Sequence, residues 1–308
     1  GSCRLCVCEV EGQKGTPASC TTPVQAGMVV HTQTDRLVRL RRNVTELLLS
    51  EQPQDGPLPA ALQELARSVG LDHVRYRHPA IRDQVQDSSN PFFSFNNAIC
   101  ISCARCVRAC DEIQGTFALT MVGRGFGSRP MAGASLYGEV STGFSTSNCV
   151  SCGACVKECP TGALTEKAIQ QHGNPTESVR TTCAYCGVGC TFDAGLRNGR
   201  VVTMVPADDG PSNHGHACMK GRFGWTYIYA EDRLKQPMLR TGSEWQAISW
   251  DAALDRLAGE FTRIKTESGP DALAAISSSR GTNEENYLFG KFIRCVMGTN
   301  HIDNCARV

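Results

Sequence analysis

Cysteine spacing is the feature that most limits what this chain of 308 residues can fold into. The sequence holds 18 cysteines, and most of them fall into groups built on C-x-x-C steps, separated by long cysteine-free stretches. Disulfide scaffolds are usually short secreted chains, whereas grouped thiols in a chain of this length favour metal binding. Such thiols must stay reduced until a metal centre is inserted, so we expect a cytoplasmic protein.

One spacing, C-x2-C-x2-C-x3-C, occurs twice between residues 99 and 165. This is the run of bacterial ferredoxins, in which the fourth cysteine of each copy ligates the other cluster. A zinc site would instead favour paired C-x2-C knuckles. The repeat therefore predicts two [4Fe–4S] clusters, one on Cys100, Cys103, Cys106 and Cys159, and the other on Cys149, Cys152, Cys155 and Cys110.

Two further groups of cysteines have spacings that suit metal binding. Four thiolates from Cys183, Cys186, Cys190 and Cys218 suit another [4Fe–4S] cluster or a zinc ion, and spacing alone leaves both open. Near the start, Cys3, Cys6 and Cys20 supply three of the four thiolates that a [2Fe–2S] cluster needs. We expect a partial site whose fourth ligand lies upstream of Gly1; the alternative is that these thiols bind no cluster. The ungrouped cysteines are expected to be ordinary buried thiols, namely Cys8, Cys295 and Cys305.

Charge and hydropathy exclude several classes of partner. The formal net charge is +1, from 31 basic and 30 acidic residues, which gives no electrostatic reason to expect nucleic acid or an anionic membrane. No stretch approaches 18 consecutive apolar residues, so no membrane span is expected. The chain begins at Gly1 without a Met and lacks a recognisable signal peptide, and both of its ends look cut.

Periodicity and capping signals predict the elements between the cysteine groups. We expect a helix from Asp35, as N-cap, to about Leu49, a second helix over 59–69 and a polar linker over 72–98. A strand is expected over 117–122, and a hairpin at Asn198-Gly199. The last 60 or so residues alternate, with a helix ending before Gly269, a buried strand over 272–276 and a capping box at Thr282.

The motifs resemble the N-terminal third of the catalytic subunit of molybdenum- or tungsten-dependent formate dehydrogenases, most closely the soluble NAD-linked type. The resemblance runs through GSCRLCVCEVEG, SCGACVKECPTGAL, TTCAYCGVGC, GHACMKGRFGW and SSSRGTNEENY to the final DNCARV. It implies an α+β multidomain chain with a partial [2Fe–2S] region over 1–34, a helical segment and linker over 35–98 and a two-[4Fe–4S] ferredoxin domain over 99–170. A [4Fe–4S] molybdopterin oxidoreductase N-terminal domain would span 179–240, and the start of a molybdopterin-binding α/β domain would span 241–308.

The resemblance also implies a function. The cluster on Cys183, Cys186, Cys190 and Cys218 would lie nearest the metal of a bis-molybdopterin guanine dinucleotide cofactor, with Lys220 as the electron relay between that cluster and a pterin. The parent enzyme would interconvert formate and carbon dioxide and exchange electrons with a flavin-containing NAD-reducing subunit or a ferredoxin. A solvated surface position is the alternative role for Lys220.

Two departures from the family pattern matter. The family's His and three Cys for a further [4Fe–4S] cluster appear here as Gln52, Gly56, Pro59 and Leu65, so we expect that cluster to be absent. The chain also stops at Val308, one residue before the family's metal-ligating Cys or selenocysteine. Our hypothesis is a misread selenocysteine codon, and a deliberate fragment is the main alternative. No catalytic residue is therefore expected within the chain, and the fragment alone should not turn over formate.

Other proteins share parts of this layout. The large iron–sulfur subunit of NADH–quinone oxidoreductase has a similar front end, but an intact double ferredoxin motif joined to CMKGRFG argues against it. Iron-only hydrogenases also share the front end, but they would carry a different cysteine pattern after residue 180. A stand-alone iron–sulfur electron carrier is the non-enzymatic alternative.

Overall fold

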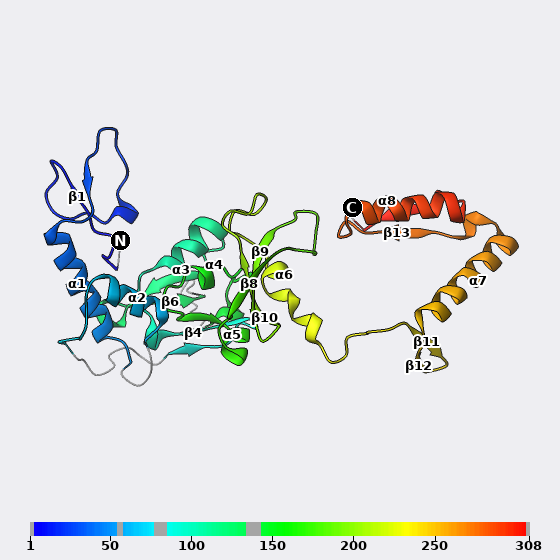
Figure 1. Ribbon diagram of the computed structural model, residues 1–308, viewed down its shortest axis with the longest axis horizontal. Helices are drawn as coiled ribbons and strands as arrows, with labels where there is room; N and C mark the ends of the chain where they lie inside the picture. Colours follow the sequence, from blue (N-terminus) through cyan, green and yellow to red (C-terminus); the bar gives the residue numbers. More distant parts are fainter. Residues whose placement is uncertain (1–2, 54–57, 77–84, 134–142, 306–308) are drawn as a thin grey trace. The chain divides into compact units, whose positions relative to one another are not determined.

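The computed structural model describes residues 3–53, 58–76, 85–133 and 143–305. It divides into two compact units, one made of residues 1–178, 194–205 and 217–219, and the other of residues 179–193, 206–216 and 220–308. Each unit is described by itself below, and Figure 1 gives the element labels. None of the helices in the described ranges combines the length and the apolar character that crossing a membrane requires.

The first unit begins with a small antiparallel strand pair, β1 (Glu9–Val10) and β2 (Val30–His31). The buried apolar side chains of this N-terminal segment include Val7, Val10 and Ala18. Val7 and Ala18 also form an isolated antiparallel bridge. This bridge folds the segment back on itself, so that the cysteines before and after it come together.

Two helices follow, α1 (Asp35–Ser50) and α2 (Ala60–Ser68), and they pack against each other. The predicted N-cap was displaced by one residue, because the side chain of Thr34, not Asp35, accepts a hydrogen bond from the Leu37 backbone N–H. Leu37 is fully buried, whereas Leu47, later in the same helix, is exposed. Helix α2 ends just before Gly70, as predicted, where a φ of +61° favours glycine.

The ferredoxin-like part of the first unit is built around a three-stranded sheet, in which β4 (Phe93–Asn96) lies between β3 (Gln86–Asp87) and β7 (Leu164–Glu166). Both pairings are antiparallel. The linker predicted over 72–98 is therefore wrong for residues 93–96, which form a buried strand, and for the two-residue strand at 86–87. The remaining elements are α3 (Arg105–Arg108), β5 (Leu119–Val122), β6 (Arg129–Ala132), α4 (Ala154–Lys157) and α5 (Lys167–His172).

A further sheet contains β8 (Glu177–Thr182), β9 (Thr191–Arg197) and β10 (Arg200–Pro206), with β9 in the middle. The hairpin predicted at Asn198-Gly199 is confirmed, and both residues take the left-handed conformation, with φ of +51° and +71°. The short helix α6 (Met219–Phe223) follows.

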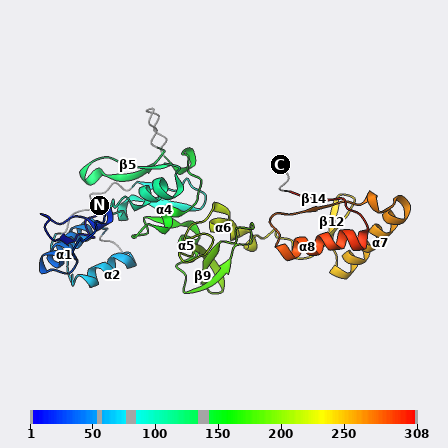
Figure 2. The same cartoon turned by 90° about the horizontal axis from the view of Figure 1, so that it is seen from above.

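The end of the second unit alternates between strands and helices, as predicted. The hairpin β11 (Met238–Thr241) and β12 (Glu244–Ala247) precedes α7 (Trp250–Ser268), which begins at the Ser249 cap and ends at Gly269. Strand β13 (Ala275–Ser277) pairs in parallel with β14 (Ile302–Asn304), and α8 (Asn283–Phe292) connects them and lies alongside (Figures 1 and 2). The capping box of Thr282 and Glu285 is present.

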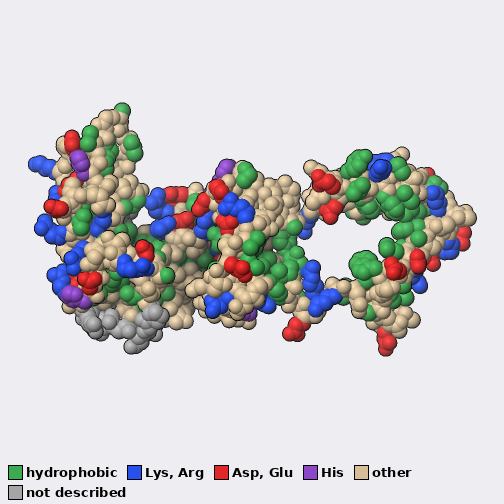
Figure 3. All heavy atoms as spheres, in the orientation of Figure 1, with side chains coloured by type: hydrophobic (Ala, Val, Ile, Leu, Met, Phe, Trp, Pro, Cys, Tyr) green, Lys and Arg blue, Asp and Glu red, His purple; other side chains and the backbone are tan. Residues whose placement is uncertain are grey.

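The apolar side chains in this last part differ from the expectation. The strand begins at Ala275, three residues later than predicted, and Ile276 is exposed although a buried strand was expected. Helix α7 contains no buried residue among those described. Hydrophobic side chains consequently show on the surface of this part of the chain (Figure 3), including Trp250 and Tyr287.

Candidate iron–sulfur centres

The four cysteines of the first predicted set line one cavity of about 330 Å³. They come from both copies of the repeat, because Cys100, Cys103 and Cys106 lie at and before α3, whereas Cys159 follows α4. The rest of the lining is mostly apolar and includes Phe95. Such a lining keeps water away from whatever the four thiols hold.

A second cavity has nearly the same size, about 310 Å³, and is lined by the other predicted set. Its aromatic wall is formed by Phe93 and Phe144, whose rings meet edge to face with centroids 5.0 Å apart. Each copy of the motif thus contributes cysteines to both cavities. The cysteines of this second set are Cys110, Cys149, Cys152 and Cys155.

Backbone N–H groups point at sulfur atoms in the same way in both copies. The N–H of Ser102 donates to Cys100 Sγ and that of Ser151 donates to Cys149 Sγ, each at 3.4 Å. Both serines take a left-handed conformation, with φ of +49° and +54°, which turns the backbone toward the sulfur. Donors in this position stabilise negative charge on sulfur, as metal-bound thiolates require.

Burial makes several of these thiols hard to ionise without a metal. Burial, followed by repulsion from Cys100, raises the pKa of Cys106 to about 12. Burial likewise raises the pKa of Cys103, Cys149 and Cys155. Positive charge from iron would offset this effect and release the protons, so four buried or half-buried thiols around a mostly apolar cavity suit a [4Fe–4S] cluster.

The two cavities are neighbours. Cys106 lines one of them and Cys155 the other. The charge of Cys106 adds to the burial that raises the pKa of Cys155. The short helices that carry these cysteines, α3 and α4, also pack together. Clusters held there would be neighbours.

The third predicted set is partly assembled within the second unit. The N–H of Cys183 donates to the carbonyl of Cys190 at 2.8 Å, which closes the C-x2-C-x3-C loop. Cys186 is exposed, and Cys218 belongs to the segment 217–219 of the first unit. Lys220 lies on α6 and its side chain is exposed.

Helix α6 is held against the loop that contains Cys183. The hydroxyl of Tyr185 donates to the carbonyl of Gly224 at 2.6 Å. Gly221 faces the same loop, because a Cβ added there would lie 2.8 Å from Phe192 Cζ and 3.1 Å from Cys183 Sγ. Only glycine fits this close approach, which positions Lys220 one residue away from the contact.

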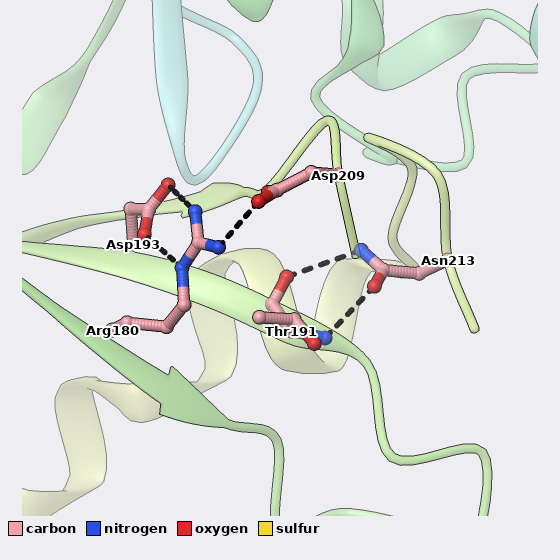
Figure 4. A network of polar contacts seen from close by, with 5 residues as sticks. All are labelled: Arg180, Thr191, Asp193, Asp209 and Asn213. Atoms are coloured by element: carbon pink, nitrogen blue, oxygen red, sulfur yellow. Dashed lines mark hydrogen bonds and ion pairs between the residues drawn. The ribbon is translucent and has the colours of Figure 1, made fainter. Parts of the chain in front are cut away.

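A polar network fixes the chain that leads toward Cys218 (Figure 4). Asn213 accepts from the N–H of Thr191 at 2.8 Å and donates to the carbonyls of Thr191 and His216, at 3.2 and 2.9 Å. Thr191 directly follows Cys190, and His216 lies two residues before Cys218.

The same network contains an arginine. Arg180 forms ion pairs with Asp193 and Asp209, and the hydrogen bond from Arg180 lowers the pKa of Asp209. Together these contacts tie the loop after β10 to strands β8 and β9 (Figure 4).

The structure also brings cysteines of the N-terminal segment together. Burial acts to raise the pKa of Cys6, but hydrogen bonds from Cys20 and Ser19 outweigh it and leave this pKa lowered. The charge of Cys3 contributes to the raised pKa of Cys103, after burial, so the segment approaches the first cavity.

In the described part of the chain, no three His, Cys, Asp or Glu side chains lie close enough to hold one metal ion. The predicted ligands of the ferredoxin-like part are instead spread around cavities.

The three ungrouped cysteines, which were expected to be buried, differ in their exposure. Cys8 is buried, as predicted, whereas Cys295 and Cys305 are exposed, contrary to the expectation. Hydrogen bonds from Ser279 lower the pKa of Cys305 to about 7.

The positions that replace the family's fourth cluster site lie in the region of α1 and α2. Gln52 is buried after α1, Pro59 precedes α2 as its cap, and Leu65 is half-buried within α2. Gly56 lies outside the described residues.

Domain comparisons agree with the order of these sites along the chain. Residues 1–35 match a 2Fe–2S iron–sulfur cluster binding domain, residues 99–163 a 4Fe–4S dicluster domain, residues 176–230 the molybdopterin oxidoreductase Fe4S4 domain, and residues 233–308 the molybdopterin oxidoreductase domain. The chain thus consists of a 2Fe–2S-like start, a 4Fe–4S dicluster domain, and molybdopterin oxidoreductase Fe4S4 and molybdopterin domain sequence. The predicted mixed α and β architecture is confirmed.

The chain is also similar to individual proteins along nearly its whole length. Over its whole length the chain is 36% identical to the NADPH-Fe(3+) oxidoreductase subunit alpha of Geobacter sulfurreducens, of which it covers 36%. It is 28% identical over 99% of its length to a Staphylococcus aureus protein that carries the name "Putative formate dehydrogenase", of which it covers 35%. The chain therefore spans about a third of the length of these relatives.

Among solved structures, an NAD+-reducing [NiFe]-hydrogenase is similar over 55% of this chain and 70% of its own chain, at 33% identity and a TM-score of 0.42.

Sequence reasoning missed several residues that support the sites. Asn90 approaches Cys149, Asn213 braces the loop before Cys218, and Gly221 packs on Cys183. Asn213 and Gly221 lie a few residues from Cys218, and that position was the one available signal for them. Asn90 is 59 residues from Cys149 and offered no local signal.

Proposed function

We propose that this chain is the iron–sulfur electron-transfer portion of a molybdopterin-dependent oxidoreductase, and that the parent enzyme is a formate dehydrogenase containing molybdenum or tungsten. The observation that carries the electron-transfer role is the pair of neighbouring cavities, each lined by four cysteines drawn from both copies of the repeat. Each cluster would supply a site that accepts and releases one electron.

The chain's own residues have defined tasks in this proposal. The cluster nearest the molybdopterin cofactor is held by Cys183, Cys186, Cys190 and Cys218. Lys220 lies between this cluster and a pterin of the cofactor. Its ammonium is a donor that suits both a sulfide and a pterin. The contact of Gly221 with Cys183 keeps Lys220 close to that cluster.

Electrons would then pass through the two clusters of the dicluster domain. Cys106 and Cys155 link their cavities, and the approach of Cys3 to Cys103 continues the line toward the N-terminal segment. A [2Fe–2S] cluster that uses Cys3, Cys6 and Cys20 would form the exit to a flavin-containing NAD-reducing subunit or a ferredoxin. Transfer between closely spaced clusters needs no movement of the chain.

A second candidate reductant is NADPH, which the 36% identity to the Geobacter protein favours. In that case electrons would enter from a nucleotide-linked subunit and leave through the molybdopterin end. The domain arrangement serves either direction.

The test uses the complete parent protein, purified anaerobically together with any subunit that copurifies. Formate and NADPH are added separately, and bleaching of the iron–sulfur visible absorbance is followed. The proposal predicts bleaching by formate together with bound molybdenum or tungsten. Bleaching by NADPH but not by formate would replace the formate assignment with the second candidate. A protein without molybdenum or tungsten would contradict both.

A further inference from the structure

Asn90 is a buried polar residue beside the second cavity. Only 2% of its surface is exposed. Its side-chain Nδ2 donates to Ser151 Oγ at 2.9 Å and lies 3.9 Å from Cys149 Sγ, within reach of a weak N–H···S hydrogen bond. The residue is distant in sequence from both partners and precedes β4, so the fold places it there.

The orientation of the Asn90 amide is determined by its other end. Its Oδ1 accepts a hydrogen bond from the backbone N–H of Phe92 at 2.9 Å. The NH2 group must therefore face Ser151 and Cys149, and its two hydrogens match these two acceptors. The flipped amide would place an oxygen against the sulfur and leave the Phe92 N–H facing an NH2 group.

The two copies of the repeat differ at this point. In both copies a serine N–H donates to the sulfur of the first cysteine. The hydroxyl of Ser102 donates to the backbone carbonyl of Ser128, whereas that of Ser151 accepts from the Asn90 amide. The side-chain amide of Asn90 is thus part of the Cys149 site, where it binds the serine that also donates to the Cys149 sulfur.

Hydrogen bonds to sulfur affect a cluster's reduction potential, because reduction adds one negative charge that the donors stabilise. We propose that Asn90 is a positioning residue that raises the reduction potential of the [4Fe–4S] cluster on Cys149, Cys152, Cys155 and Cys110. The inference rests on the proposed function, since it requires a cluster at that site. Reduction there adds one electron to the cluster while the Asn90 amide keeps its proton.

The experiment is a potentiometric titration of the full chain, purified and reconstituted anaerobically, with each cluster followed by electron paramagnetic resonance. Asn90→Leu removes the donor with little change in size. Asn90→Asp keeps an acceptor for the Phe92 N–H but removes the NH2 group. Asn148→Asp is the matched control, because it places the same charge directly before Cys149 on an exposed residue.

We expect a lower midpoint potential for one cluster in both Asn90 variants and unchanged potentials for the other clusters. Asn148→Asp should leave all potentials unchanged, and Cys149→Ser should alter the same signal that responds to Asn90. An unchanged potential in Asn90→Leu, or equal shifts in Asn90→Asp and Asn148→Asp, would overturn the inference alone. If Cys149→Ser alters none of the signals seen in the wild-type chain, the proposed function would be overturned as well.

Discussion

Gly221→Ala tests whether the close packing of α6 on Cys183 secures the third cluster. The new methyl carbon would lie 2.8 Å from Phe192 Cζ and 3.1 Å from Cys183 Sγ, whereas carbon atoms in ordinary contact lie about 3.5–4.0 Å apart. The Phe192 ring is fully buried, and the close packing of a protein interior leaves little room for it to shift. The strain must therefore be relieved in part by moving Cys183 or α6.

The size of the effect follows from two opposing contributions. Overpacking by one methyl group costs about 1–3 kcal/mol. Alanine offsets about 1 kcal/mol of this, because it favours the helix more than glycine does. The difference, up to about 2 kcal/mol, corresponds to up to about a 30-fold weaker retention of the cluster.

The assay is the release of iron to a chelator from the anaerobically reconstituted chain. We expect about four of about 12 iron atoms to leave in a faster phase in the variant, because only one of three clusters is affected. Gly259→Ala in α7 is the control, since a Cβ there meets nothing within 4 Å and should leave iron release unchanged. Identical release from Gly221→Ala and wild type, or equal acceleration for all clusters, would refute the reasoning.

Two other expectations concern the polar contacts. Hydrogen bonds from Arg75 lower the pKa of Glu46 from 4.5 to about 2, so their stabilisation should be complete above pH 4.5 and be lost as the pH falls toward about 2. Urea unfolding measured across this range should show a weaker acid dependence in Glu46→Gln, and an unchanged dependence would contradict the assignment. Asn213→Asp should lower the iron content by about four atoms per chain, because a carboxylate cannot donate to the two carbonyls that Asn213 joins. Asn198→Asp, the same change in an exposed turn, should keep the full content, and equal iron in both variants would count against a bracing role for Asn213.

Local sequence signals predicted the parts of the fold that depend on neighbouring residues. The caps of α7 and α8 and the turn at Asn198-Gly199 follow from residues a few positions apart, and the structure confirms them. The ferredoxin spacing likewise names which cysteines should meet, and the structure places those two sets around two cavities. The confirmed predictions therefore came mostly from patterns among residues that are close in the sequence.

The features that sequence reasoning missed depend on contacts between distant residues. Strand β4 lies in a stretch that was expected to be a linker, and its pairing with β7 joins residues some 70 positions apart along the chain. Asn90 reaches Cys149 through the same long-range arrangement. The apolar run around Ile276 predicted a buried strand, but Ile276 is exposed. Burial depends on which elements cover a side chain, and the composition of the run does not reveal this.

The measurement that tests the central claim most directly is the metal and sulfide content of the anaerobically reconstituted chain, combined with spin counting after reduction. Three [4Fe–4S] clusters predict about 12 iron and about 12 sulfide per chain, beyond any contribution of the N-terminal site, with no zinc. About eight iron with one zinc would assign Cys183, Cys186, Cys190 and Cys218 to a zinc site. A chain that takes up zinc but no iron would contradict the electron-transfer account as a whole.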